Sequence, residues 1–138
     1  MNEYVFEELE LGFKRGFSVV VTETMMESFK VLSGDQNSLH MDREYALSLG
    51  FKDRVVFGLL TGSFYSQLVG MELPGKYAIM QGIDIKFAKP VFVGDKLTIE
   101  GEVTYKNDIL KVIEVKALIV NQDQTKVSSA KINIGLLK

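Results

Sequence analysis

The hydrophobic residues of this chain change their spacing at Pro74, and this change constrains the fold more than any other feature. From Thr24 to Gly70 the apolar residues recur at helical intervals, and beyond Pro74 they alternate with polar residues. Alternation is the period of a strand with one covered face. A chain of 138 residues is expected to form a single domain over residues 1–138, since domains usually contain about 100–200 residues. The sequence therefore predicts one α+β domain.

The helical block before Pro74 has recognisable ends. Thr24 is a candidate N-cap for a first helix that should end near Gly34. Asp42 can cap a second, short helix over Arg43–Leu49. The apolar positions of the first helix are Met26, Phe29 and Val31 or Leu32. A third segment carries no charge, and its apolar residues recur every four positions, as in a core-facing helix: Val56, Leu60, Phe64 and Leu68.

Several segments have the composition and alternation of strands: Phe17–Thr22, Tyr77–Phe87, Lys96–Lys106, Ile109–Asn121 and Val127–Ile134. The connections Asn107-Asp108 and Asn121–Gln124 are short, so the strands that they join should be antiparallel neighbours. The apolar face of such a sheet must be covered, and the uncharged helix Val56–Leu68 is the candidate cover. We therefore expect a curved antiparallel β-sheet wrapped around a central hydrophobic helix.

The composition argues against several classes of function. The absence of Cys excludes disulfides, thiolate catalysis and cysteine zinc sites, and a single His makes a histidine-rich metal site impossible within one subunit. We expect no metal. A net charge of −2 gives no general attraction to nucleic acid or an anionic membrane. Met1–Gly12 lacks the pattern of a secretory signal, and the uncharged stretch Val55–Met71 is short for a membrane span. We expect a cytoplasmic protein without nucleic-acid or membrane partners.

The segment Leu32–His40 contains the candidate chemistry. Asp35 and His40 are five residues apart, so they would point in different directions in a regular helix or strand. They can converge only if the segment folds back, which the intervening residue types permit: Gly34, Asn37 and Ser38. A converged carboxylate–imidazole pair can hold one water molecule and exchange protons with both ends of a small reaction. The alternative is that both are solvated loop residues, and their spacing alone leaves this open.

Two residues of the uncharged helix are further candidates. Gly58 stands near the helix start, where free N–H groups and the helix dipole favour a developing negative oxygen, although it could simply allow close packing against the sheet. Ser63 could present its hydroxyl to the Asp35–His40 loop, or bond a carbonyl one turn earlier. Scattered basic residues could meet an anionic cofactor tail or only improve solubility: Lys52, Arg54, Lys86 and Lys89.

Together these residues resemble the hydratase motif of the MaoC-like, (R)-specific enoyl-CoA hydratase family. The resemblance covers nearly the whole chain, with its motif residues in Phe29–Asp42, Phe51, Arg54–Ser63, Leu73–Gly75 and Phe87–Asp95. Two positions depart from the family pattern. Ser38 stands where a proline is usual, which leaves the loop less constrained. Phe57 stands where a histidine often precedes the glycine, which makes the pocket wall more apolar.

The resemblance implies a hot-dog fold, in which an antiparallel sheet wraps a long central helix, and a homodimer or dimer of dimers formed through sheet edges. It also implies reversible hydration of trans-2-enoyl thioesters to (R)-3-hydroxyacyl thioesters. Asp35 and His40 would share the water as an acid–base pair, the Gly58 N–H would polarise the thioester carbonyl, and Ser63 would support the site. The implied substrate-binding residues are Asn37, Phe57 and Leu59.

The implied substrate is an acyl thioester of CoA or of an acyl carrier protein. No cofactor is expected, because CoA or the phosphopantetheine of the carrier protein enters as part of the substrate. Two alternatives stay open. One is a hot-dog acyl-CoA thioesterase, which would release a free thiol. The other is a non-catalytic module that binds an acyl chain or a partner, in which Asp35 and His40 are structural. The match to the hydratase pattern argues against the thioesterase.

Overall fold

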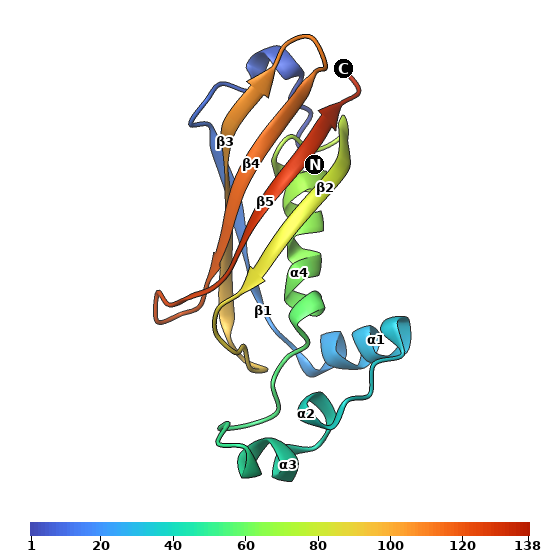
Figure 1. The fold of residues 1–138 in the computed structure, drawn as a ribbon, viewed down its shortest axis with the longest axis vertical. Helices are drawn as coiled ribbons and strands as arrows, with labels where there is room; N and C mark the ends of the chain where they lie inside the picture. Colours follow the sequence, from blue (N-terminus) through green and yellow to red (C-terminus); the bar gives the residue numbers. More distant parts are fainter.

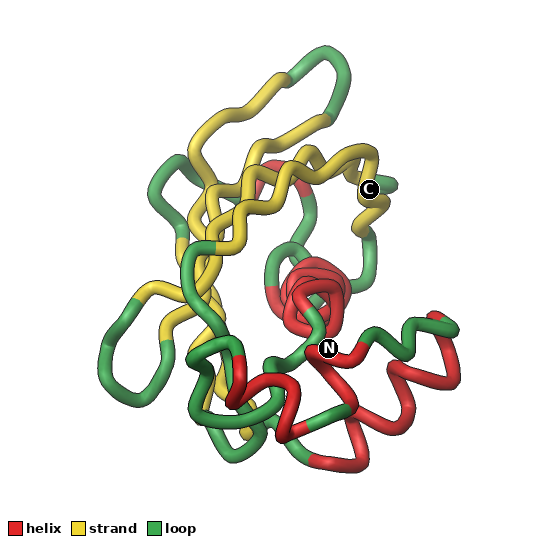
Figure 2. Tube along the Cα trace, turned by 60° about the horizontal axis from the view of Figure 1, so that its bottom comes forward, coloured by secondary structure: helices red, strands yellow, loops and turns green.

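The computed structural model describes residues 1–138, and it contains one five-stranded antiparallel sheet that curves around one central helix (Figure 1). The elements follow in the order η1 (Phe6–Glu8), β1 (Lys14–Val20), α1 (Glu23–Ser33), α2 (Ser38–Met41), α3 (Arg43–Ser48), α4 (Gly58–Gln67), η2 (Leu68–Glu72), β2 (Ala78–Phe87), β3 (Lys96–Asn107), β4 (Val112–Val120) and β5 (Lys126–Leu136). Figure 2 looks nearly along α4 and shows the sheet bending around it. The predicted α+β architecture is confirmed.

The order of the strands in the sheet is β1-β3-β4-β5-β2. The two short connections predicted from the sequence join β3 to β4 and β4 to β5, and both pairs are antiparallel neighbours as expected. The expected meander does not extend back to β2, because β2 pairs with β5 and its connection to β3 crosses to another position in the sheet. As a result β1 and β2 are the two edges, and the end of β2 lies beside the start of β5.

The central helix packs its apolar side chains into the core, as its spacing predicts. Leu60, Phe64 and Leu68 are all at most 7% exposed. Val56 is equally buried, but it precedes the helix, which begins at Gly58. The facing strands contribute alternate residues that are completely buried, among them Leu97, Ile99, Val103, Ile113, Val115, Ile119, Ile132 and Ile134. Each such side chain contributes about 1.5–3 kcal/mol by leaving water, so the layer between α4 and the sheet holds the fold together.

A chain of two hydrogen bonds ties α4 to the strands at the end of β2. The hydroxyl of Tyr65, which is completely buried, donates to Ser128 Oγ over 2.9 Å. Ser128 donates in turn to the carbonyl of Lys86 over 2.9 Å. Burial raises the pKa of Tyr65 to about 12, since the charged phenolate would be poorly solvated there. The hydrogen bonds therefore join three elements at the point where β2 ends.

The first helix confirms one end of the prediction and corrects the other. Gly34 ends α1 in the left-handed conformation with φ 73°, as its residue type suggested. The N-cap, however, is Thr22 and not Thr24, because Thr22 Oγ1 accepts from the N–H of Met25 over 3.2 Å. Of the apolar residues of this helix, Val31 and Leu32 do not pack into the core, since these side chains are 79% and 83% exposed.

Other boundaries shift by a few residues. Asp42 caps α3 as predicted, through the N–H of Tyr45. The first strand, expected over Phe17–Thr22, occupies Lys14–Val20. The strand expected from Ile109 begins only at Val112, because the side chain of Asn107 accepts from the N–H groups of the next residues and holds them in a turn. None of the helices is both long and apolar enough to cross a membrane.

Candidate active site

The segment between α1 and α2 is shaped by its own polar side chains. After the left-handed Gly34, Asp35 Oδ1 accepts from the N–H of Asn37 over 2.9 Å. The side-chain oxygen of Asn37 accepts from the N–H of Leu39 over 2.9 Å and caps the short helix α2. Asx turns of this kind reverse the chain without help from the core. They place His40 in the last turn of α2.

The ring of His40 is held by one hydrogen bond and one aromatic contact. Nδ1 lies 2.7 Å from the carbonyl oxygen of Val55. A carbonyl can only accept, so Nδ1 carries the hydrogen and Nε2 of the neutral ring remains an acceptor. Phe57 packs against the imidazole with 4.3 Å between ring centroids, and Phe29 packs against Phe57 at 4.9 Å. The imidazole is therefore fixed in both tautomer and orientation.

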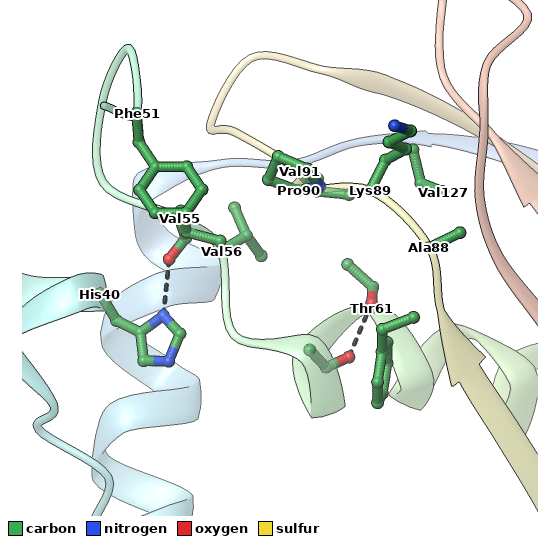
Figure 3. Close-up of a pocket in the computed structure, with 12 residues that line it drawn as sticks. His40, Phe51, Val55, Val56, Thr61, Ala88, Lys89, Pro90, Val91 and Val127 are labelled. Atoms are coloured by element: carbon green, nitrogen blue, oxygen red, sulfur yellow. Dashed lines mark hydrogen bonds between the residues drawn. The ribbon is translucent and has the colours of Figure 1, made fainter. Parts of the chain in front are cut away.

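His40 lines a cavity of about 380 Å³ at the N-terminal end of α4 (Figure 3). The cavity lies between the loop that follows α3, the start of α4 and the connection from β2 to β3. In Figure 3, His40 lies at one side of it and Thr61 and Ala88 lie at the other. The walls are mainly apolar, and they include Phe51, Val55, Val56, Phe87, Pro90 and Val91. Such a cavity suits an apolar group that carries a few polar atoms.

Gly58 is the first residue of α4 and also lines this cavity. No acceptor takes its N–H, because the first N–H groups of a helix have no partner one turn earlier. The positive end of the helix dipole lies at the same place. A Cβ at position 58 would come within 3.3 Å of the Phe87 ring, so the glycine allows that ring to pack closely against the start of the helix. One cavity thus contains an imidazole and a free backbone donor.

The other residues predicted for the site do not line this cavity. Phe57 lies behind His40 and is buried, whereas Asp35 and Asn37 are exposed in the turn before α2. Leu59 is 63% exposed. Ser63 donates its hydroxyl to the carbonyl of Leu60 over 2.6 Å, in a separate groove between α1 and α4. The structure therefore brings together His40 and Gly58, and it does not bring Ser63 or Leu59 to them.

Residues that sequence reasoning did not select also line the cavity. Thr61 is buried and donates its hydroxyl to the carbonyl of Gly58 over 2.6 Å. Its spacing of three residues from Gly58 is a usable signal, because such residues share a helix face. Phe87 reaches the cavity only because β2 pairs with β5, which the sequence did not reveal. The carbonyl that orients His40 carries no sequence signal, since every residue has one.

The candidate basic residues have separate environments. Arg54 forms an ion pair with Glu23, and the Lys52 amine lies 4.5 Å from the centre of the Phe92 ring. Lys89 lines the His40 cavity, whereas Lys86 lies on the other face of the sheet. No group of three His, Asp or Glu side chains is arranged to hold a metal ion. Only Lys89 is therefore placed to meet a charged group in the cavity.

Comparisons with known proteins match both the sequence and the fold. The sequence model of the MaoC-like domain matches residues 8–125. The (R)-specific enoyl-CoA hydratase of Aeromonas caviae is 41% identical over 98 residues, which are 71% of this chain and 73% of that protein. A mitochondrial 3-hydroxyacyl-[acyl-carrier-protein] dehydratase of Arabidopsis thaliana is 32% identical over 72 residues, 52% of this chain and 42% of its own length.

Among solved structures, the unliganded R-hydratase PhaJ1 from Pseudomonas aeruginosa superimposes with a TM-score of 0.89 at 31% identity, covering 96% of this chain and 84% of that one. The curved sheet around α4 is therefore a hot-dog fold, as the resemblance implied. The chain belongs to the MaoC-like domain family.

Proposed function

We propose that this protein is a lyase that reversibly adds water to trans-2-enoyl thioesters and forms (R)-3-hydroxyacyl thioesters. One observation carries the proposal: the Nε2 acceptor of His40 and the free N–H of Gly58 belong to residues that line one largely apolar cavity. Hydration of an enoyl thioester needs this combination, because a proton leaves water while negative charge builds on the thioester oxygen. The activities named for the Aeromonas and Arabidopsis relatives support the same reaction.

In the proposed reaction the water oxygen bonds to the β-carbon as one O–H bond breaks, and a proton is added to the α-carbon. His40 and Asp35 act together as the base and the acid. Asp35 accepts a backbone hydrogen bond through Oδ1, which leaves Oδ2 free to accept one from the water. The Gly58 N–H donates to the thioester oxygen and stabilises its negative charge. The thioester bond stays intact, and CoA or a carrier-protein arm enters only with the substrate.

The test replaces His40 by Gln and follows loss of the conjugated enoyl thioester by ultraviolet absorbance. Because general acid–base catalysis contributes about 10²–10⁴-fold, we expect His40→Gln to lower kcat by that factor while the unfolding midpoint stays near that of the wild type. Gln36→Ala is the matched control, since Gln36 is an exposed neighbour in the same turn. Full activity of His40→Gln would contradict the proposal.

The same assay separates the two alternatives. A thioesterase would release a free thiol, which a thiol reagent detects, whereas the hydratase releases none. A non-catalytic module would bind the acyl thioester with equal affinity in the wild type and in His40→Gln, and neither protein would turn it over.

We also propose that two copies pair through β2. This strand is an edge of the sheet, and it exposes apolar side chains along its length: Ile79, Ile83 and Phe87 are 49%, 39% and 52% exposed. An exposed, long and apolar edge strand favours pairing with another strand. A second β2 offers the same surface, so the contact would be self-complementary, as in most dimers. Phe87 brings this edge to the wall of the His40 cavity.

A further inference from the structure

A second hollow, of about 370 Å³, lies on the face of the sheet turned away from α4. It extends across three adjacent strands, β2, β5 and β4 (Figure 1). Four lysines line it: Lys86, Lys116, Lys126 and Lys131. The hollow contains a single carboxylate, that of Asp84. The chain as a whole has a net charge of −2, so this concentration of positive charge is local. We refer to this hollow as the lysine groove.

The positive charge of the lysine groove is only partly neutralised. Lys116 lies directly opposite Lys131 in the pairing of β4 with β5, an arrangement of like charges that is unfavourable to the sheet. Glu114 lies 3.5 Å from Lys131 and is itself only 20% exposed, whereas Asp84 lies 4.0 Å from Lys86 in an exposed pair that stabilises little. Lys116 and Lys126 have no carboxylate within ion-pair distance. The fold therefore carries unpaired cations that packing does not require.

The lysine groove and the His40 cavity are built from the same strand ends. Lys86 precedes Phe87, and Lys126 precedes Val127; in each pair the lysine lines the groove and its neighbour lines the cavity. Successive residues of a strand point to opposite faces, so the two hollows lie back to back. Lys89, three residues after Lys86, lines the cavity itself. Three residues span at most about 11 Å, so Lys86 and Lys89 lie near each other along the chain at the end of β2, one at each hollow.

We infer that the lysine groove docks an acidic surface of a protein that carries the substrate on a phosphopantetheine arm. This inference rests on the proposed function, because it assigns the carrier of the thioester. The groove contains no arginine, which would bind a phosphate through two parallel hydrogen bonds, and no aromatic ring, which would stack on a nucleotide base. It offers point charges spread over three strands, which suit carboxylates on a protein surface, and a partly exposed leucine, Leu118, for an apolar contact. Pairing through the β2 edge leaves this face uncovered.

The test reverses the two unpaired charges in Lys116→Glu with Lys126→Glu. Steady-state hydration is measured with the same enoyl group on an acyl carrier protein and on CoA, at low and high salt. We expect KM for the carrier-protein substrate to rise about tenfold or more, because docking depends on the charges, while its kcat stays unchanged. Both constants for the CoA substrate should stay unchanged. The salt dependence of the carrier-protein reaction should weaken in the variant.

The matched control, Lys96→Glu with Lys138→Glu, changes the net charge equally at exposed positions outside the groove. An equal rise of KM in this control, an equal loss with the CoA substrate, or no change in the groove variant would each overturn the inference. Binding of the unacylated carrier protein, followed by fluorescence anisotropy, needs no turnover. Tenfold weaker binding by the groove variant would support docking even if the wild type hydrated neither substrate, a result that would refute only the proposed function. Equal binding would refute docking.

Discussion

The start of α4, the cavity and the end of β2 meet at Gly58. Its place next to the Phe87 ring predicts that Gly58→Ala lowers kcat/KM, because the added methyl must displace the ring or occupy the space above the N–H donor. We expect a loss of about tenfold or more, with the free energy of unfolding changed by less than about 1 kcal/mol.

The double variant Gly58→Ala with Phe87→Leu tests the steric explanation. A smaller side chain at position 87 makes room for the methyl group, so part of the lost activity should return. Enoyl thioester kinetics and urea unfolding of both variants provide the comparison. A double variant no more active than Gly58→Ala would show that Phe87 is not the cause.

Tyr65 predicts a specific dependence of stability on pH. Its folded-state pKa of about 12 lies above the ordinary value of 10.0, so its contribution to stability is complete below pH 10 and is lost as the pH rises toward 12. Relative to Tyr65→Phe, the wild type should lose about 1 kcal/mol of unfolding free energy between pH 9 and pH 11. Urea unfolding at the two pH values measures this difference, and the exposed Tyr45→Phe is the control.

At the scale of elements, the end of α1 determines how the chain enters the Asp35–His40 turn. Gly34 has φ 73°, whereas Gly70 in η2 has no positive φ, and a Cβ at either position would meet nothing within 4 Å. We therefore expect Gly34→Ala to destabilise the protein by about 1 kcal/mol and Gly70→Ala to be neutral or slightly stabilising. Thermal unfolding of the two variants isolates the backbone effect, and equal behaviour would contradict it.

Periodicity was sufficient to predict the five strands and the longer helices because it reports which face of each segment is covered, and it missed the short helices η1, α2 and η2. The four-residue spacing of Leu60, Phe64 and Leu68 and the alternation in β3 both end in buried side chains. Periodicity does not say which strands pair, and for this reason the position of β2 beside β5 was missed. It also gave no reason to expect that Val31 and Leu32 stay exposed at the end of α1.

Local sequence determines the turn that leads to His40 and the start of the helix at Gly58, and these two residues line the cavity. Asp35 and Asn37 accept hydrogen bonds from the backbone of their own turn, which leads to His40, and Gly58 begins a helix. The rest of the cavity depends on contacts across the fold. The carbonyl of Val55 and the ring of Phe87 come from segments that are distant from His40 in the sequence. The tertiary fold places them at the cavity, and no short motif predicts that placement.

For the whole molecule, the exposed apolar edge predicts a dimer of the 15.5 kDa chain at micromolar concentration. Ile83→Lys should convert it to a monomer, because a lysine on an edge strand opposes edge-to-edge pairing. Ile109→Lys is the control: Ile109 is 93% exposed in the turn between β3 and β4, away from the β2 edge. Sedimentation or light scattering gives the mass of each protein. A monomeric wild type would refute pairing through β2.

The placement of Phe87 has a consequence for how this molecule would respond to its substrate. One ring belongs both to the exposed edge of the sheet and to the wall above Gly58. A ligand that fixes the Phe87 ring in the position that a second subunit requires would favour pairing through β2. Pairing would in turn hold the ring in the position that the ligand requires. By thermodynamic linkage, each bound substrate would strengthen subunit affinity by the factor by which pairing strengthens substrate affinity at one site.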